Sequence, residues 1–338
     1  MKRPYYLFNG GMMSRKDNTL CFVSDTLDEN GAKRPAKYIP IETASDLFVF
    51  GALDVNAALL NFLGQQSVAV HFFDYYEHYT GSFMPRDYLL AGKTQIKQTQ
   101  AYLSAKKRMS IAQAFIEGAS FNMLKNLKYY NGREKDTSKQ IEQIETYRPS
   151  IPLSKDVPEL MGIEGNCRQV YYSAFDTIIT DFEMGNRSRQ PPSNEVNALI
   201  SFGNMMCYTL ALSQIYHTQL NPTISFLHEP GARRYSLALD LAEIFKPILV
   251  DRIIFKLLNK KEIQAKHFDK NMNGCRLNNA GRQIFTREWD AKLKETIAHR
   301  AMKDKKLSYR HLVKLECYKL QKYILGLDET YKPFKIWW

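Results

Sequence analysis

Short apolar runs without helical periodicity fill the first part of the chain. The runs at residues 20–23, 46–50 and 67–73 are rich in β-branched and aromatic residues, and turn-forming glycine, asparagine and aspartate separate them. An amphipathic stretch at about 54–63 predicts one short helix between strands. We therefore predict a small β-rich N-terminal domain over residues 1–85.

The hydrophobic pattern changes to helical spacing from about residue 92. One apolar stripe runs through Ile111, Phe115, Ala119 and Asn122/Met123. Loops around a short helix are expected in the polar stretch 129–160. Further helices are predicted at 162–180, 194–217 and 236–246 and in a basic helical tail at 252–325.

These patterns together predict an α+β fold class. The β-rich domain at 1–85 is followed by a linker at 86–91 and by a larger all-α catalytic domain at 92–338. Two domains are expected because a single hydrophobic core rarely serves more than about 250–300 residues.

The charge of the chain narrows the range of partners. Its 338 residues carry a formal net charge of +12. Such a surplus favours a polyanionic partner, because it concentrates that partner near the surface and speeds association. No apolar run reaches the roughly 18 residues of a membrane span, and no signal sequence is visible. We expect a cytoplasmic protein that binds nucleic acid and no membrane.

Glu164 is the first candidate for chemistry, near the start of the predicted helix at 162–180. Arg168 follows at i+4 and Tyr172 at i+8, so the three side chains share one helical face. The structural alternative is a first-turn carboxylate that is favoured only by the helix dipole.

His228 is the second candidate, between an apolar run and the turn Pro230-Gly231. This position predicts a side chain at the end of an element, facing a cleft. A purely structural histidine is the alternative.

The third candidate is a pair of carboxylates, Asp240 and Glu243. They are three residues apart and share one face of the helix predicted at 236–246, for which Ser236 is the predicted N-cap. The flanking residues are so apolar that this helix is expected to be buried, and paired buried carboxylates need cations. An ordinary solvated acidic face is the alternative.

These segments offer one imidazole and two or three carboxylates. Mg²⁺ and Mn²⁺ prefer carboxylate oxygen, and Mn²⁺ also accepts imidazole nitrogen. Phosphodiester chemistry uses such an ion to neutralise the phosphate and to activate the attacking oxygen. The chain has no HExxH, P-loop, GxGxxG or GxSxG motif, so the commonest other active sites are not indicated.

At these residues the sequence resembles the CRISPR-associated spacer-acquisition integrases, the family called "Cas one". The stretches that carry the resemblance are 162–165, 191–203, His228 with 236–243, and Lys246-Pro247 with Asp251. Their order and spacing fit the family over nearly the whole chain. Lys246 departs from it, since arginine is more usual before that proline, and lysine keeps the charge but loses bidentate geometry.

The resemblance implies a site and a reaction. Glu164, His228 and Glu243 would bind Mg²⁺ or Mn²⁺, with Asp240 as a supporting or alternative ligand. The protein would be a homodimer that uses its β-rich domain for dimerisation and partner contacts and assembles with a small partner called "Cas two". It would bind double-stranded and branched DNA and join the 3′-hydroxyls of short foreign DNA to the CRISPR repeat by transesterification.

Six further residues are expected to contact DNA because they are basic, aromatic or amide side chains near these segments. They are Arg168, Tyr172, Arg189, Asn197, Arg233 and Arg234. For each of them a structural or solvated role is the alternative.

Two other functions remain open. A general branched-DNA repair nuclease would use the same metal site. A non-catalytic basic DNA-binding scaffold would explain the charge, but it would leave Glu164, His228 and Glu243 without a reason.

Overall fold

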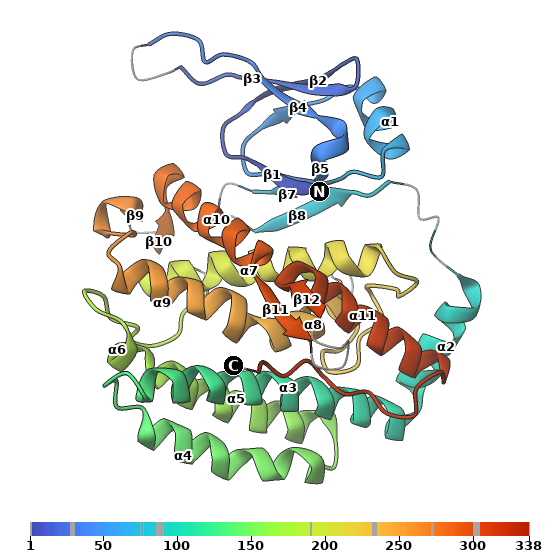
Figure 1. Ribbon diagram of the computed structural model, residues 1–338, viewed down its shortest axis with the longest axis vertical. Helices are drawn as coiled ribbons and strands as arrows, with labels where there is room; N and C mark the ends of the chain where they lie inside the picture. The colour runs from blue at the N-terminus through green and yellow to red at the C-terminus, as the bar shows by residue number, and fades with distance from the viewer. Residues whose placement is uncertain are drawn as a thin grey trace. The chain divides into compact units, whose positions relative to one another are not determined.

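The computed structural model describes residues 2–27, 31–74, 76, 78–85, 89, 91–189, 191–231, 235–271, 274–299 and 305–337. The chain forms two compact units, Met1–Tyr88 and Leu89–Trp338. The first is β-rich and the second mainly helical (Figure 1), which confirms the predicted fold class. Most of the predicted linker at 86–91 lies outside the described residues.

Two four-stranded sheets form the N-terminal unit. The first has the order β1-β5-β7-β8, in which only β8 is antiparallel to its neighbour. The second has the order β4-β3-β2-β6. The strands are β1 (Arg3–Leu7), β2 (Gly11–Lys16), β3 (Thr19–Ser24), β4 (Lys37–Pro40), β5 (Ala44–Val49), β6 (Leu53–Asp54), β7 (Ala69–Phe73) and β8 (Tyr79–Phe83).

One short helix, α1 (Ala57–Gln65), joins β5 to β7 and confirms the helix predicted in this region. Parallel neighbours need such a crossover connection. Asn56 caps the helix by accepting a hydrogen bond from the backbone N–H of Leu59 at 2.9 Å. Leu59 is then buried with Leu20 and Leu47 of the strands in the core of this unit.

Ten helices are described in the second unit. They are α2 (Gly92–Leu103), α3 (Ala105–Asn131), α4 (Ser138–Tyr147), α5 (Val157–Ser173), α6 (Phe175–Ile178), α7 (Glu195–Tyr216), α8 (Ser236–Lys246), α9 (Arg252–Asn259), α10 (Asn279–Lys294) and α11 (Tyr309–Leu325). Both α3 and α7 pack against α8. Most side chains of α8 are buried, which confirms the prediction that this helix is buried.

The central helix of this unit is α7, and most of its side chains are buried. It is long and apolar enough to cross a membrane, but 78% of its apolar window is buried inside the protein, as expected of a core helix. Gly203 allows this helix to approach the turn after α8, since a Cβ here would lie 2.4 Å from a methyl group of Val250.

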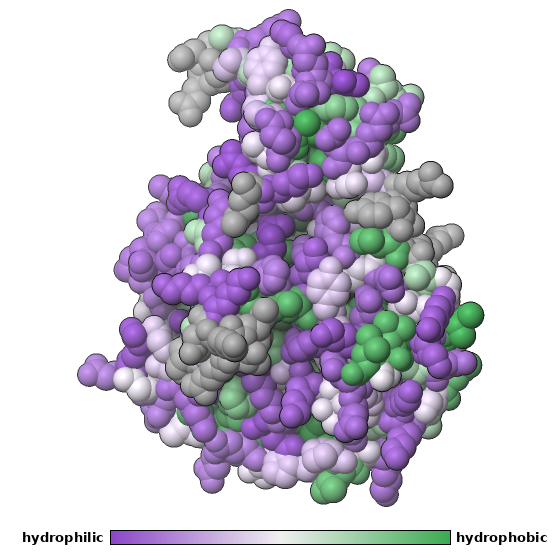
Figure 2. All heavy atoms as spheres, turned by 45° about the vertical axis from the view of Figure 1, so that its right-hand side comes forward, coloured by the Kyte–Doolittle hydropathy of each residue, from purple (hydrophilic) through white to green (hydrophobic). Residues whose placement is uncertain are grey.

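On the face shown in Figure 2, hydrophilic side chains cover most of the surface.

The start of α5 differs from the prediction. Asp156 caps the helix by accepting a hydrogen bond from the backbone N–H of Glu159 at 2.8 Å, and a proline occupies the first turn. Glu164 therefore lies well inside the helix, and the first-turn dipole explanation for this residue is wrong.

The predicted helical tail also contains two hairpins. β9 (Phe268–Asn271) pairs with β10 (Gly274–Leu277), and β11 (Thr296–His299) pairs with β12 (Lys305–Ser308). Both are antiparallel and only four residues long, so their strands are too short and too polar to show a strand pattern in the sequence. After α11 the chain continues as an irregular segment in which Tyr331, Phe334 and Ile336 are buried.

Candidate active site and metal centre

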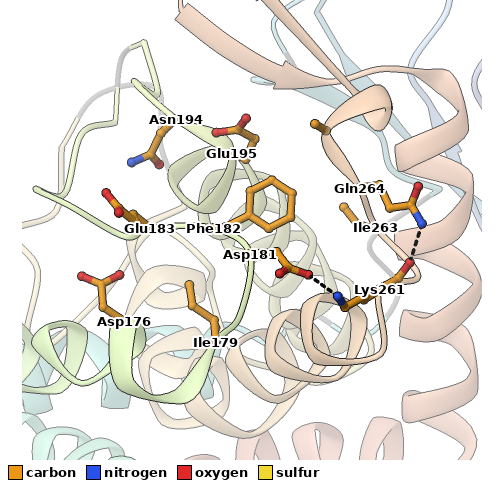
Figure 3. A pocket seen from close by; sticks show the side chains of 11 residues that line it. Asp176, Ile179, Asp181, Phe182, Glu183, Asn194, Glu195, Lys261, Ile263 and Gln264 are labelled. Atoms are coloured by element: carbon orange, nitrogen blue, oxygen red, sulfur yellow. Dashed lines mark hydrogen bonds and ion pairs between the residues drawn. The ribbon is translucent and has the colours of Figure 1, made fainter.

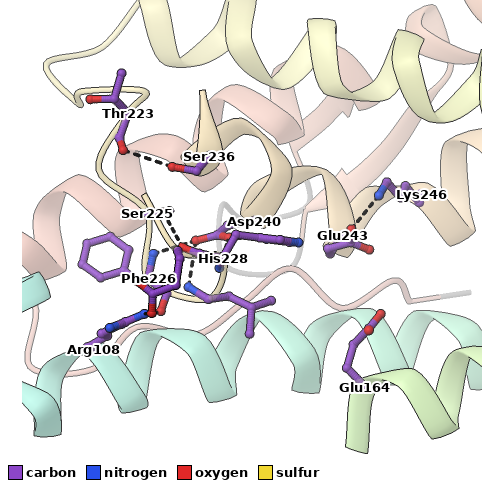
Figure 4. Close-up of polar contacts among 12 residues, drawn as sticks. Arg108, Glu164, Thr223, Ser225, Phe226, His228, Ser236, Asp240, Glu243 and Lys246 are labelled. Atoms are coloured by element: carbon purple, nitrogen blue, oxygen red, sulfur yellow. Dashed lines mark hydrogen bonds and ion pairs between the residues drawn. The ribbon is translucent and has the colours of Figure 1, made fainter. Parts of the chain in front are cut away.

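Three elements of the helical unit bring the candidate ligands together. Glu164 is on α5, Glu243 is on α8, and His228 is in the loop between α7 and α8. In Figure 4, Glu164 points from α5 towards Glu243, and the His228 ring points towards the same carboxylate. The three residues that the sequence indicated therefore lie in the same region of the helical unit.

Asp240 holds the loop that carries His228. One carboxylate oxygen accepts the backbone N–H groups of Phe226 at 2.7 Å and Leu227 at 3.0 Å, and the other accepts the backbone N–H of His228 at 3.0 Å. The second oxygen also lies 2.7 Å from Nδ1 of His228. Asp240 is fully buried, so backbone N–H groups provide the partners that a buried carboxylate requires.

This contact determines which nitrogen of His228 is available. A carboxylate oxygen accepts hydrogen bonds, so this contact favours the tautomer in which Nδ1 donates to Asp240 and Nε2 is left as the acceptor nitrogen. The side chain is 21% exposed, whereas Asp240 is enclosed. Asp240 is therefore suited to orienting His228, because both of its oxygens are held by the loop, whereas the oxygens of Glu243 are held by the side chains of Arg168 and Lys246.

Other contacts around this loop were not predicted from the sequence. Arg108 of α3 donates from Nε to the carbonyl of Phe226 at 3.0 Å and pairs with Glu229. Ser236 donates to the carbonyl of Thr223 at 3.0 Å and does not cap α8, so its predicted N-cap role is wrong. Arg108 sits in a run of basic residues, where the sequence offers no signal that separates it from surface charge.

Glu164 and Glu243 are joined by a cation that belongs to the chain. The guanidinium of Arg168 pairs with both carboxylates, and Nζ of Lys246 lies 2.5 Å from the second oxygen of Glu243. Burial raises the pKa of Glu243, but the charges of Arg168 and Lys246 outweigh burial and lower it to about 2. Glu243 is thus an ionised carboxylate whose charge is balanced by two side chains.

Asp251, which follows α8, has a different environment. It is buried, and burial raises its pKa to about 7, although Arg168 and the hydroxyl of Tyr171 favour the charged form. No backbone cage like that of Asp240 is recorded around this carboxyl among the described residues.

The donor set fits a hard divalent ion. Two carboxylates and one imidazole nitrogen are ligands that Mn²⁺ accepts and that Mg²⁺ tolerates. Among the described residues, however, no group of three or more histidine, cysteine, aspartate or glutamate side chains stands ready at metal-binding distances. The guanidinium of Arg168 pairs with both Glu164 and Glu243.

The residues predicted to contact DNA fall into different environments. Arg168 is engaged by the two carboxylates, and Tyr172 is buried, with its ring 5.2 Å from that of Phe175. Arg189 is exposed. Arg233 and Arg234 lie outside the described residues.

Asn197, also expected to contact DNA, has the structural role that was the alternative. It is fully buried, and its carbonyl oxygen accepts bonds from Nη1 of Arg187 at 2.9 Å and from the backbone N–H of Ser188 at 3.0 Å. Its amide donates to the carbonyl of Asn186 at 3.0 Å. Asn197 therefore anchors the loop before α7, because every polar atom of its side chain is already paired.

A cavity of about 910 Å³ lies elsewhere in this unit, and acidic side chains line much of it (Figure 3). Asp181 pairs with Lys261 at 3.0 Å, and Glu195 pairs with Lys270 at 2.6 Å. The lining is too acidic to attract a polyanion. It includes none of the three candidate ligands.

Comparison with known proteins decides the family. A family model described as "CRISPR associated protein Cas1" matches residues 5–291. The chain belongs to the Cas1 family. Glu164, His228 and Glu243 all fall inside the matched region.

Curated relatives in the Cas1 family match from end to end. The "CRISPR-associated endonuclease Cas1 3" of Thermodesulfovibrio yellowstonii is 47% identical over 99% of this chain and 100% of its own length. The "CRISPR-associated endonuclease Cas1" of Fusobacterium nucleatum is 45% identical over 100% of this chain and 98% of its own.

Solved structures agree with this assignment. A CAS1 protein from Thermotoga maritima has a TM-score of 0.84 at 39% identity and covers 98% of this chain and 100% of its own. A casposase bound to its integration product has a TM-score of 0.85 over 98% of this chain and 93% of its own, but at 20% identity it shows only the shared fold.

Proposed function

We propose that the chain is a metal-dependent DNA integrase of CRISPR spacer acquisition. It joins the 3′-hydroxyls of a short foreign duplex to the CRISPR repeat, and Glu164, His228 and Glu243 hold Mg²⁺ or Mn²⁺. The observation that carries the proposal is the orientation of His228. Its Nδ1 is held by Asp240, and its ring points towards Glu243, which Arg168 joins to Glu164.

The reaction exchanges one phosphodiester for another. The 3′-oxygen of the incoming strand bonds to the phosphorus and gives up its proton, while the 3′-oxygen of the repeat strand leaves and gains one. When bound, the divalent ion would polarise the phosphate and lower the pKa of the attacking hydroxyl. Since the nucleophile belongs to DNA, the chain needs no nucleophilic side chain.

The chain's own residues supply positioning and charge. Asp240 keeps His228 in one tautomer and one orientation. Arg168 and Lys246 balance the carboxylates before the ion binds, and once released they are close enough to the site to contact a phosphate. Arg189 adds exposed positive charge, which favours binding to the DNA backbone.

The proposed partners follow from the fold shared with other proteins. One solved structure with this fold is a "Cas6-RT-Cas1--Cas2 complex", with a TM-score of 0.81 at 16% identity, covering all of this chain and 36% of that one. Another is a "TtCas1-DNA complex", with a TM-score of 0.55 at 14% identity. We infer that this chain acts as a homodimer in the cytoplasm, with a Cas2 partner, on double-stranded and branched DNA.

The test is strand transfer into a plasmid that carries the repeat. Purified protein and its Cas2 partner are incubated with a short 3′-hydroxyl duplex and Mn²⁺ or Mg²⁺. We expect joining at the repeat that EDTA abolishes and that His228→Ala lowers by at least about a hundredfold. DNA binding without joining or cutting under either metal would instead support a non-catalytic scaffold.

A nuclease function has its own support, because curated relatives are named endonucleases. The same assay separates it from integration. Metal-dependent cutting of branched DNA that needs neither the repeat nor the Cas2 partner would favour a repair nuclease.

A further inference from the structure

The helix that carries Glu243 ends in an unusual way. After α8 the chain forms a π-helical turn, Pro247–Asp251. Pro247 has no N–H to donate, and a π-turn replaces i→i−4 bonds by i→i−5 bonds, so the backbone at this junction departs from the α-helical bonding pattern. Such turns occur frequently at functional sites.

Two asparagines of α3 donate hydrogen bonds to backbone carbonyls at this junction. Nδ2 of Asn122 donates to the carbonyl of Ile244 at 2.9 Å, and Nδ2 of Asn126 donates to the carbonyl of Pro247 at 2.5 Å. The asparagines are four residues apart and therefore share one face of α3. Both are fully buried, and a buried amide is costly unless its hydrogen bonds are made.

Asn126 also reaches the helix that carries Glu164. Its Nδ2 lies 3.0 Å from the hydroxyl of Tyr171, which is on α5. That hydroxyl also hydrogen-bonds Asp251, the last residue of the π-turn. One buried amide thus joins α5 to the end of α8, the helices on which Glu164 and Glu243 stand.

Asn122 connects the same junction to the C-terminal segment, residues 331–337. It donates to the carbonyl of Phe334 at 3.2 Å and accepts the backbone N–H of Ile336 at 2.9 Å. The ring of Phe334 stacks on Phe245, two residues after Glu243 on α8, with centroids 5.4 Å apart. Gly118, one turn earlier on α3, leaves room for this segment, because a Cβ there would lie 2.9 Å from Pro333.

We propose that Asn122 and Asn126 are positioning residues for the metal centre. They fix α5 and α8 relative to each other, and so set the separation of Glu164 and Glu243, and the C-terminal segment takes part through Asn122. This inference rests on the proposed function, because it needs an ion bound between those two carboxylates. Residues that orient metal ligands without touching the ion change metal affinity by about 10–100-fold when they are replaced.

The test measures Mn²⁺ binding to the full-length protein by titration calorimetry, well below the unfolding temperature of every variant. Asn122→Ala and Asn126→Ala are expected to weaken binding by about tenfold or more. The electron paramagnetic resonance spectrum of the bound Mn²⁺ should change as well. Asn122→Ser and Asn126→Ser, which leave a hydroxyl in place of the amide, repeat the test if the alanine variants do not fold.

Thr137→Val is the matched control. Thr137 is fully buried and donates to the carbonyl of Leu127 in α3 at 3.0 Å. Its removal costs a buried hydrogen bond to the same helix, and that bond involves neither α5 nor α8, so Mn²⁺ affinity should stay within about twofold.

Each outcome has a defined meaning. Asparagine variants that are less stable but bind Mn²⁺ as well as Thr137→Val would overturn the inference and leave only a structural role. A wild-type protein that binds no Mn²⁺ would overturn the metal centre itself, and this inference with it.

Discussion

Two carboxylates on one helix, Asp240 and Glu243, are stabilised in opposite ways. Asp240 is fixed by three backbone N–H groups and by His228. Glu243 is balanced by the long side chains of Arg168 and Lys246. Backbone groups cannot leave without unfolding the loop, whereas a side-chain cation can change rotamer while the backbone stays in place. The His228 half of the site is therefore fixed, and the carboxylate half is held by side-chain partners that an ion or a phosphate would replace under the proposed function.

The largest expected effect comes from removing the Asp240 carboxylate, which holds the His228 loop. Asp240→Ala leaves three backbone N–H groups and the Nδ1–H of His228 without an acceptor. We expect the free energy of unfolding to fall by about 5 kcal/mol or more, since each unmade buried bond costs about 1–3 kcal/mol. Strand transfer should be lost with it. Urea denaturation measures the first effect, and stability near that of wild type would show that the loop does not depend on Asp240.

For the carboxylate half, Glu164 and Glu243 with Arg168, we expect an effect on stability that depends on metal. Arg168→Met keeps much of the side-chain volume but leaves Glu164 and Glu243 without their shared cation. Without metal, we expect the variant to lose about 3 kcal/mol of stability, because buried charges become unpaired. Added Mn²⁺ should restore that stability and bind more tightly than to wild type, because no side chain has to be displaced.

Thermal unfolding with and without Mn²⁺ measures this difference. Arg148→Met is the control, since Arg148 pairs with Glu117 on α3 and with neither candidate ligand. An equal Mn²⁺-induced shift in Arg168→Met and wild type would mean that Arg168 does not occupy the place of the ion.

The sequence predicted much of the architecture from periodicity. The helices that became α7 and α8 were predicted within a few residues, because their apolar stripes are long and regular. The start of α5 was missed, although Asp156 followed by Val157-Pro158 is a helix-start signal that was available. The two hairpins were missed because four-residue strands carry too little pattern.

The candidate site was predicted less completely. Glu164, His228 and Glu243 were chosen with the help of family resemblance, and their role as metal ligands stays a prediction. The choice between Asp240 and Glu243 needed the folded loop, because the bonds of Asp240 come from backbone groups 12 to 14 residues away in sequence. Asn122 counted only as part of an apolar stripe, since periodicity shows that a residue is buried but not which carbonyl it meets.

The smallest expected effect concerns Arg108, which lies beside the His228 loop. Arg108 supports the His228 loop twice, through the carbonyl of Phe226 and through Glu229. Glu229 is 69% exposed, so that ion pair contributes little, whereas the bond to the Phe226 carbonyl is partly buried. Arg108→Met is expected to lower stability by about 1 kcal/mol.

Glu229→Gln, which removes only the exposed ion pair, should lower stability by at most about 0.5 kcal/mol. Urea denaturation of both variants separates the two contributions. Equal losses would mean that the bond to the Phe226 carbonyl adds nothing to stability. A larger loss in Arg108→Met would show that α3, through Arg108, helps to hold the His228 loop. The same helix carries Asn122 and Asn126, which contact the end of α8.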